Sequence, residues 1–431
     1  MKKDRYIRPA LRRMLRAAAC TALPALLLTA CGDDGEEDVP SGPARRTVIV
    51  YAAAQNTLGT GGYLRADSAE LVRGARSLKN DEHLLLFADD AGGARIYRFR
   101  SGGGAPERVW SRAGETCSTD PATLAEVLAW CARAYPADEY GLVMWSHASG
   151  WVPSTNPPAG TPLSFGIDAG AGGHGDMTAD GRLGVQMDIE DIAQAIETAG
   201  VRMRYVLFDA CLMQSLETAY ALRGVTDYVI GAPISTPAAG ADYEHQVRDG
   251  LFSNDPADIA RTYYADVTDP ANASDYSDFG IAVAAVRTGA LDALAATTAD
   301  VLPRSALAGR ADADMEGVQQ YANYSASFGW RPHAYDAAEA MRRLLTAADF
   351  ARYKAALDAA IAWQGVTERF YVGPSWRDYF TADASRACGV SMFVPRPIYT
   401  DRADACDHGD LNEAFRHTAW YRDAGWAATG W

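Results

Sequence analysis

The chain has 431 residues, of which 48% are hydrophobic and 22% are charged. This composition is typical of a globular protein, and it excludes a collagen, a coiled coil and a wholly disordered chain. The 55 acidic residues outnumber the 40 basic ones, so we expect no nucleic-acid partner, because nucleic-acid binding requires a basic face. The length predicts two domains or one large decorated domain.

The first thirty residues have the pattern of a bacterial export signal. A basic segment precedes an uncharged apolar stretch of 14 residues, Ala17 to Ala30. That stretch is too short to cross the roughly 30 Å hydrocarbon layer as a permanent helix. It ends Leu28-Thr29-Ala30-Cys31, which resembles the lipobox of bacterial lipoproteins. We therefore predict a lipoprotein signal peptide over 1–30 and a lipid on Cys31; the alternative is an ordinary signal peptide with an incidental cysteine.

Residues 31–45 are acidic and rich in Gly and Pro, a composition that predicts a flexible tether. Together with the lipid on Cys31, this tether predicts anchoring in the cell envelope of a Gram-negative bacterium, at the outer membrane, on its surface or periplasmic face. Without residues 1–30 the chain holds 33 basic and 54 acidic residues, a net charge of −21. Such an acidic body attracts cationic ligands and peptides.

The next part of the chain alternates between strand and helix patterns. Short apolar runs rich in β-branched residues predict buried strands, and Asp120-Pro121 and Asp188 predict helix starts. Alternation of this kind indicates βαβ units and a mainly parallel sheet covered by helices on both faces. The predicted strands are 47–53, 84–88, 95–99 paired with 107–110, 140–145, 205–208, 228–230 and 281–286.

Three further segments differ from this alternation. Residues 148–186 are rich in Gly, Pro and Asp and predict a long loop, which in a compact domain is usually functional or mobile. A helix is predicted over about 213–222, and residues 289–365 predict mainly helices. A late strand at 390–394 and a final amphipathic helix at 412–421 complete the pattern.

Five of the seven cysteines follow Cys31: Cys117, Cys131, Cys211, Cys388 and Cys406. In an oxidising compartment we expect most of them to pair. The spacings allow Cys117–Cys131 and Cys388–Cys406 bridges, although the sequence does not establish connectivity. This assignment leaves Cys211 unpaired; the alternative for a lone cysteine is a small buried hydrophobic residue.

Two neighbouring strands end in reactive residues. One ends in Trp145-Ser146-His147 and the other in Phe208-Asp209-Ala210-Cys211, and the carboxyl ends of parallel strands meet in one crevice. A thiol attacks a carbonyl carbon while an imidazole serves as base and then acid. We expect the N-terminus of the helix after Cys211 to lower the pKa of the thiol.

At these positions the sequence resembles the clostripain family of cysteine peptidases, which share the caspase-type α/β fold. The resemblance implies that Cys211 is the nucleophile and His147 its acid/base partner. It also implies a caspase-like peptidase domain over 46–288, with a helical region over 289–431 packed on it. The matching pieces are Val48 to Leu58, Trp145-Ser146-His147-Ala148-Ser149-Gly150-Trp151, Asp209-Ala210-Cys211-Leu212-Met213 with Glu217, Gly389 to Pro395, and Trp420 and Trp426.

One position departs from the family. The family usually has Gly directly after the histidine, where its backbone N–H and that of the nucleophile bind the oxyanion; this chain has Ala148 beside His147. An alanine serves there only if its φ is negative. Ala148 therefore raises an alternative function, a catalytically weak or inactive surface lipoprotein that binds peptide or glycan on a peptidase-derived scaffold.

The resemblance also implies a preference for Arg or Lys on the acyl side of the cleaved bond. Asp209 is the matching carboxylate for that side chain; the alternative is a strand-end Asp that caps the next helix. Some family members cleave themselves between the two motifs, and here Arg182 is the single basic residue between Ala148 and Val201. The alternative for Arg182 is a solvated turn residue, which we favour.

Some relatives use calcium, and Asp176, Asp180 and Gly181 match part of a calcium loop. Position 12 of that loop is Met187 rather than Glu, so an EF-hand is not supported. We expect no required cofactor and no metal site, with calcium as an optional ligand. The sequence as a whole predicts a lipid-anchored cysteine endopeptidase that acts on peptides or proteins through a thioester intermediate.

Overall fold

The computed structural model describes residues 43–152, 164–269, 280–322, 333–372, 378–400 and 410–431. The predicted signal peptide, the lipid site Cys31 and the bridge partner Cys406 lie outside these residues. All described residues belong to one compact unit. Within them, no helix combines the length and hydropathy that a membrane-spanning helix requires.

A nine-stranded sheet runs through the described part of the chain, in the order β13-β10-β9-β8-β5-β1-β2-β3-β4. The five strands from β9 to β2 are parallel, and antiparallel strands extend the sheet on both sides. The predicted mainly parallel sheet is thereby confirmed. The strands are β1 (Ala44–Ala53), β2 (Glu82–Asp90), β3 (Gly93–Phe99), β4 (Glu107–Ser111), β5 (Ala137–Trp145), β8 (Met203–Asp209), β9 (Tyr228–Gly231), β10 (Ala282–Arg287) and β13 (Ile361–Val366).

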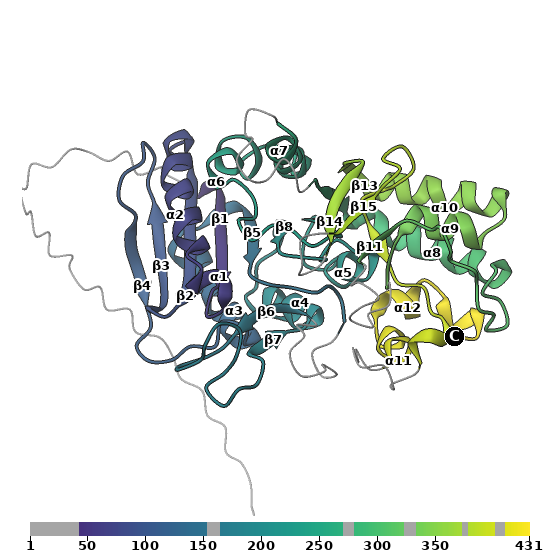
Figure 1. Ribbon diagram of the computed structural model, residues 1–431. Coiled ribbons are helices and arrows are strands. Elements are labelled where there is room, and N and C mark those ends of the chain that lie inside the picture. Colours follow the sequence, from purple (N-terminus) through teal and green to yellow (C-terminus); the bar gives the residue numbers. More distant parts are fainter. Residues whose placement is uncertain (1–42, 153–163, 270–279, 323–332, 373–377, 401–409) are drawn as a thin grey trace, which may run out of the picture. The chain divides into compact units, whose positions relative to one another are not determined.

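Helices cover both faces of this sheet, because successive side chains of a strand point to opposite faces. Val48 and Val50 of β1 pack with the helices of one face, and Ile49 and Tyr51 pack with those of the other. Figure 1 shows α2 running along the strands in front of the β1–β3 part of the sheet. On the Val48 side lie α2 (Tyr63–Gly74), α6 (Tyr243–His245) and α7 (Ala257–Thr268); on the Ile49 side lie α3 (Pro121–Ala134), α4 (Ile189–Thr198), α5 (Leu216–Ala221), α8 (Leu291–Val301), α9 (Ala337–Leu344), α10 (Ala347–Ala360), α11 (Leu411–Arg416) and α12 (Ala419–Asp423).

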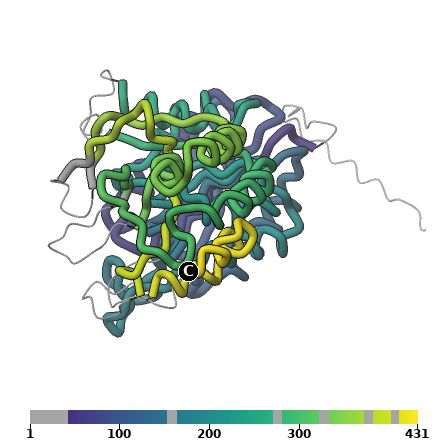
Figure 2. The backbone as a smooth tube through the Cα atoms, turned by 90° about the vertical axis from the view of Figure 1, so that its right-hand side faces the viewer, coloured from purple at the N-terminus to yellow at the C-terminus, as the bar shows by residue number. Residues whose placement is uncertain are grey.

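The region after residue 288 contributes more strand than the sequence predicts. β13 directly follows α10 and pairs with β10, so it forms one edge of the main sheet. The predicted final helix is split at His417 into α11 and α12, and Thr418 caps the second helix. Figure 2 shows the helices of this region on one side of the described unit. The smaller strands are β6 (Phe165–Asp168) with β7 (Val185–Met187), β11 (Gln320–Ala322) with β12 (Ala334–Asp336) and β16 (Ser391–Met392), and β14 (Arg369–Val372) with β15 (Asp378–Thr381).

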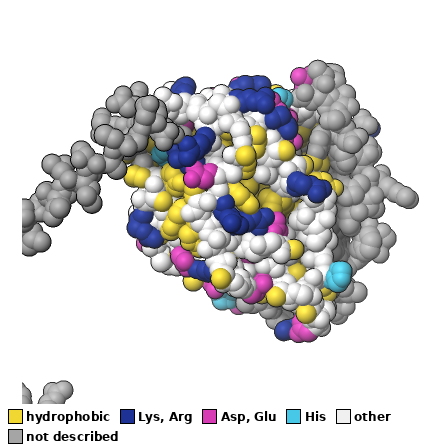
Figure 3. All heavy atoms as spheres, turned by 90° about the vertical axis from the view of Figure 1, so that its left-hand side faces the viewer, with side chains coloured by type: hydrophobic (Ala, Val, Ile, Leu, Met, Phe, Trp, Pro, Cys, Tyr) yellow, Lys and Arg dark blue, Asp and Glu magenta, His cyan; other side chains and the backbone are white. Residues whose placement is uncertain are grey.

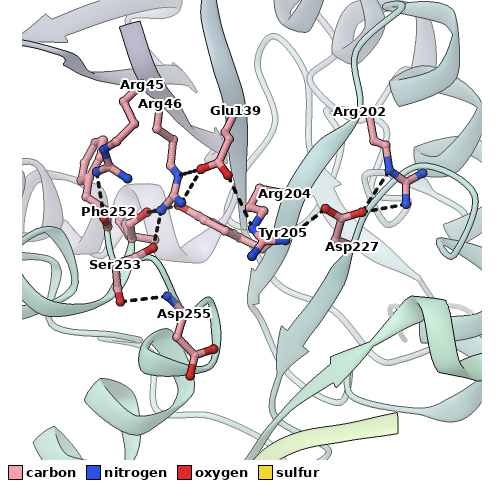
Figure 4. Close-up of polar contacts among 11 residues, drawn as sticks. Arg45, Arg46, Glu139, Arg202, Arg204, Tyr205, Asp227, Phe252, Ser253 and Asp255 are labelled. Atoms are coloured by element: carbon pink, nitrogen blue, oxygen red, sulfur yellow. Dashed lines mark hydrogen bonds and ion pairs between the residues drawn. The ribbon is translucent and has the colours of Figure 1, made fainter.

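A buried arginine holds the amino end of the central strands. Arg46, near the start of β1, is 1% exposed. Its Nε donates to Glu139 on the neighbouring β5 at 2.9 Å, and its Nη1 donates to the carbonyls of Leu251 and Ser253 at 2.9 and 2.7 Å. Figure 4 shows these contacts with the adjoining Arg204–Asp227 pair. This network ties the helical layer to the end of the sheet opposite the predicted site.

Candidate active site

The two predicted site residues come from adjacent parallel strands. Trp145 of β5 lies opposite Asp209 of β8 in the register of the sheet, so His147 and Cys211 each follow two residues later. Both line one cavity of about 100 Å³, together with Leu58, Thr236 and other residues of the loops after β1 and β9. The structure therefore brings the predicted thiol and imidazole into one cavity.

The imidazole of His147 is held from the side opposite β8, by the turn after β1. Its Nε2 lies 2.8 Å from the hydroxyl Oγ1 of Thr57 and 3.6 Å from Asp176 Oδ1. The Thr57 hydroxyl donates its single proton to Asp176 at 2.9 Å, so it accepts the hydrogen bond from Nε2–H. Nδ1 is then the unprotonated nitrogen.

Burial lowers the pKa of His147 from its ordinary value of 6.5, against the opposing influence of Asp176. The imidazole is therefore neutral at pH 7, with a basic nitrogen available. Sequence reasoning named Asp176 only as part of a calcium loop and missed Thr57. Thr57 lies in the turn after the first strand, which is part of the resemblance to the family. Nothing in the sequence of that turn indicates that a side chain there contacts the histidine.

A buried asparagine holds this turn in place. Asn56 is 1% exposed, and its Nδ2 donates to the carbonyls of Ala53 and Ile167 and to Ser146 Oγ. Its Oδ1 accepts from the backbone N–H of Leu58, which caps the short helix α1 (Thr57–Thr60). One side chain thus joins the ends of β1, β5 and β6, and it positions Thr57 beside the imidazole.

The thiol of Cys211 lies in a tight turn. Its Sγ accepts a hydrogen bond from the backbone N–H of Thr236 at 3.3 Å. Burial raises the pKa of the Cys211 thiol above its ordinary value of 9.0. The thiol is therefore protonated at pH 7, and the predicted lowering of its pKa is wrong.

The reason is the path of the backbone after Cys211. Leu212 has a φ of 64°, and its N–H bonds to the carbonyl of Ile234, as that of Gln214 does to Ala232. This left-handed residue prevents a helix from beginning at residue 213, and α5 begins only at Leu216. The helix N-terminus is consequently not adjacent to the sulfur.

Asp209 lies in the same cavity as the thiol and is 5% exposed. It accepts hydrogen bonds from the Tyr243 hydroxyl at 2.7 Å, the Tyr263 hydroxyl at 3.3 Å and the backbone N–H of Ala241 at 3.2 Å. Burial raises the pKa of Asp209 to about 6, so the carboxyl is ionised at pH 7. The alternative, a cap on the next helix, is not observed, because Ser215 caps α5.

A glycine and a second carboxyl complete the surroundings of Asp209. A Cβ at Gly240 would lie 2.7 Å from both carboxylate oxygens of Asp209, so the backbone can pack this closely on the carboxylate only because the residue is glycine. On α2, Asp67 accepts from the indole Nε1 of Trp145 at 2.7 Å. Burial, and next the charge of Asp209, raise the pKa of Asp67 to about 9. Asp67 is therefore neutral at pH 7 and leaves Asp209 as the ionised member of the two.

Ala148 adopts a conformation that alanine tolerates. Among the described non-glycine residues, positive φ angles occur at Leu212 and Arg310, and Ala148 is not one of them. Ala148 lies opposite Phe165 in an isolated antiparallel bridge. The hydrogen bonds of this bridge join the residues on either side: the Gly166 N–H donates to the His147 carbonyl, and the Ser149 N–H donates to the Ser164 carbonyl. In such a pair the N–H of Ala148 points away from the neighbouring strand.

The disulfide predictions are not supported. Cys117, Cys131, Cys211 and Cys388 are all free thiols in the described part of the chain. Cys131 lies on the buried face of α3 and Cys117 contacts Thr119 Oγ1 at 3.4 Å, so the predicted Cys117–Cys131 bridge is wrong. Cys388 is buried and contacts the carbonyl of Val390, and its predicted partner Cys406 lies outside the described residues.

The loop between the two motifs exposes Arg182. The guanidinium is 81% exposed and pairs with Asp180 at 2.9 Å. Asp176, at the other end of this turn, binds the N–H and hydroxyl of Thr57. The residues that the structure describes contain no group of three or more His, Cys, Asp or Glu side chains suited to a metal ion. Calcium binding therefore stays a prediction.

Solved structures similar to this chain are peptidases. A secreted C11 cysteine protease from Bacteroides thetaiotaomicron, in complex with an irreversible peptide inhibitor, is 27% identical, with a TM-score of 0.71; the match covers 89% of this chain and 99% of that one. An inactive zymogen C11 protease from Parabacteroides distasonis is 24% identical, with a TM-score of 0.70, over 90% and 99% of the two chains. No curated protein sequence matches the chain.

The family profile described as the clostripain family, peptidase family C11, matches residues 50–344. This range is more than half of the chain, and it contains both strand ends and the turn that holds the imidazole. Together with the caspase-like sheet and the paired Cys and His motifs, it shows that this chain belongs to the clostripain family of cysteine peptidases.

Proposed function

We propose that the chain is an endopeptidase that cleaves peptide bonds through a Cys211–His147 dyad. The observation that carries this proposal is the cavity that both side chains line, with the ionised Asp209 among its other lining residues. The peptide inhibitor bound to the Bacteroides relative supports a peptide as the substrate class.

The protonation states favour a proton transfer coupled to attack. Both groups are neutral at pH 7, since burial raises the pKa of the Cys211 thiol and lowers that of His147. Nδ1 of His147 takes the thiol proton as sulfur bonds to the carbonyl carbon, and Thr57 keeps the imidazole in the required tautomer. The backbone N–H groups of Ala148 and Cys211 stabilise the oxyanion.

The second half of the reaction uses the same proton. The imidazolium of His147 donates it to the leaving nitrogen, the C–N bond breaks and a thioester on Cys211 remains. Water then attacks the thioester carbon, with Nδ1 accepting one of its protons. The C–S bond breaks, the acid product leaves and the imidazolium returns the proton to sulfur.

The residue on the acyl side of the cleaved bond is Arg or Lys in this proposal. A cationic side chain in the cavity would meet the carboxylate of Asp209, which Tyr243 and Tyr263 hold in place. Gly240 lines the same cavity, so no side chain from that position fills the space beside the carboxylate. The alternative of an inactive scaffold depended on Ala148, and its negative φ removes that objection.

The test compares peptides that differ only in the acyl-side residue: Arg, Lys, Gln or Glu. We expect cleavage after Arg and Lys, loss of all cleavage in Cys211→Ala, and no loss in the matched variant Cys117→Ala, another free thiol. In Asp209→Asn, kcat/KM for the Arg peptide should fall about a hundredfold while that for the Gln peptide is retained. Equal cleavage of all four peptides would refute the assigned preference.

The lipid anchor is a separate proposal that depends on the sequence of residues 1–45. We propose that Cys31 carries the lipid and places the peptidase at the outer membrane of a Gram-negative cell. Mass spectrometry of the mature protein should show an acylated Cys31 as the first residue, and a cut after Arg182 if the enzyme processes itself. In Cys31→Ser the protein should leave the membrane fraction.

A further inference from the structure

A second and larger cavity lies on the side of His147 away from Cys211. Its volume is about 630 Å³, and eight of its 17 lining residues are glycines. The loops after β1 and β2 and the segment 169–175 form its walls, and this segment leads directly into Asp176. The cavity therefore shares its wall with the residues that hold the imidazole.

The order of the sheet places this cavity along the path of the leaving group. From β8, which ends near Cys211, the sheet continues to β5 with His147, then to β1 and β2. Strands are about 4.8 Å apart, so the cavity begins about 10–14 Å from the sulfur. Because the imidazole protonates the leaving nitrogen, the chain after the cut runs past His147. An extended residue spans about 3.3 Å, so the backbone of the third residue reaches the near end of the cavity, and a long side chain on the second residue extends toward it.

The walls of the cavity suit an extended peptide. Gly93 and Gly114 have φ angles of 81° and 85°, and a Cβ at either would meet no atom within 4 Å. Both glycines therefore present bare backbone to open space, which lets another main chain approach closely. The conformation of these turns disfavours any other residue, so the open backbone is built into the fold.

The charge of this cavity is negative. Glu115 is exposed at its rim, where Gln55 Nε2 donates to its Oε1 at 2.9 Å, and it forms no ion pair within the described residues. Gln55 also donates at 3.3 Å to the buried Asp89 behind the wall, and burial raises the pKa of Asp89 to about 7, so Glu115 is the main negative charge of the cavity. The other lining carboxylate, Asp90, is neutralised by Arg95 at 2.8 Å.

The neighbouring edge of the sheet has the opposite character. Figure 3 shows Lys and Arg side chains among hydrophobic surface on the face near β3 and β4. Arg98 stacks over Tyr135 there, whereas Arg112 stacks over Trp110 and also pairs with Glu126. The cavity beside His147 is therefore the more favourable of the two surfaces for a cationic peptide.

We propose that this cavity is a binding site for the leaving side of the substrate, and that it prefers Lys or Arg at the second or third residue after the cut. Glu115 is the residue that determines this preference. The inference rests on the proposed dyad, because the dyad fixes the direction of the peptide. The enzyme would then recognise a segment with basic residues on both sides of the cleaved bond.

The first experiment follows cleavage of one bond, Arg–Ala, by mass spectrometry in three peptides that share an acyl side ending in Arg, so that cuts after Lys are counted separately. Their leaving sides are Ala-Lys-Lys-Ala, Ala-Ala-Ala-Ala and Ala-Glu-Glu-Ala. We expect kcat/KM to be about three- to tenfold higher for the Lys peptide than for the Ala peptide, and lowest for the Glu peptide. Glu115→Lys should reverse this order, whereas Glu197→Lys, at an exposed glutamate on α4, should leave it unchanged.

The second experiment does not require cleavage. The three tetrapeptides, with free amino ends, are titrated into the full chain carrying Cys211→Ala, and their affinities are measured by calorimetry. If the Lys peptide binds more tightly than the others and Glu115→Lys abolishes this difference, the binding site is supported. If the same enzyme then cuts no peptide, the proposed function fails while the binding site stands. Equal affinities for all three tetrapeptides overturn the inference, even if the enzyme cleaves after Arg.

Discussion

Replacing Asp67 by Asn tests whether a carboxyl group beneath the site is held neutral. The side chain is 4% exposed, and burial and the charge of Asp209 raise its pKa from an ordinary value of 3.8 to about 9. Between these two values the folded chain keeps a proton that the unfolded chain releases. The free energy of unfolding therefore falls as pH rises, by up to about 1.4 kcal/mol per pH unit. Below pH 3.8 both states are protonated and the effect vanishes.

The stability cost of the Asp67 proton follows from the interval between the unfolded and folded pKa values. A pH of 7 lies about three units above 3.8, so keeping Asp67 protonated costs about 4 kcal/mol of stability at pH 7. Asparagine does not ionise, and its carbonyl oxygen still accepts the hydrogen bond from Trp145 Nε1. We therefore expect Asp67→Asn to raise the free energy of unfolding at pH 7 by about 2–4 kcal/mol.

The assay is urea unfolding followed by tryptophan fluorescence at pH 5, 6, 7 and 8. Both chains carry Cys211→Ala, which prevents self-digestion. The gain from Asp67→Asn should grow with each pH step, while Asp138→Asn, at an exposed position on β5, should give no pH-dependent gain. A gain that is the same at all four pH values would show that the native state does not hold this proton.

Three further results are expected. Arg46→Met should lower the free energy of unfolding by about 3–5 kcal/mol in urea, because it leaves a buried hydrogen-bonding network without its donor, whereas Arg202→Met, at an exposed pair, should cost under about 1 kcal/mol. Thr57→Val should lower kcat about 10- to 100-fold with little change in KM, because the imidazole loses the acceptor for Nε2–H, and Thr57→Ser should restore it. For an Arg peptide, KM should fall as pH rises through about 6, where Asp209 ionises, and this dependence should be absent from Asp209→Asn.

The central sheet was predictable because its strands are short buried runs between helices with clear caps. Asp120 caps α3 with Pro121 at its first position, as the sequence predicts, and the hairpin of β3 and β4 pairs as expected. Local signals of this kind need no knowledge of distant residues.

The later part of the chain was predicted less well. β13 follows an Ala-rich helix without a break, and its identity as a strand depends on pairing with β10, some 75 residues earlier. The helix predicted from residue 213 begins later because Leu212 adopts a left-handed conformation, which a leucine in the sequence does not predict. In both places tertiary contacts override local propensity.

In the candidate site, too, some residues were predictable from the sequence and others were not. His147 and Cys211 were found because each ends a strand, and strand ends of a parallel sheet converge. Thr57 and Tyr243 were missed because neither has a sequence spacing to the residue that it holds. The cysteine prediction reached Cys211 by pairing the other cysteines, but Cys117, Cys131 and Cys388 are free thiols in the described part of the chain. What distinguishes Cys211 is its place in the cavity beside His147.

The edge strand β13 has a consequence for the order in which the molecule is completed. Cys211 and its strand are synthesised when half of the chain is made, yet the edge of β10 stays unpaired until residue 366 has emerged. An unpaired apolar edge recruits other strands, so chains cut short before β13 should aggregate although the His147 and Cys211 motifs are both present. Cys211 therefore precedes, by about 150 residues, the strand that completes this edge of the sheet.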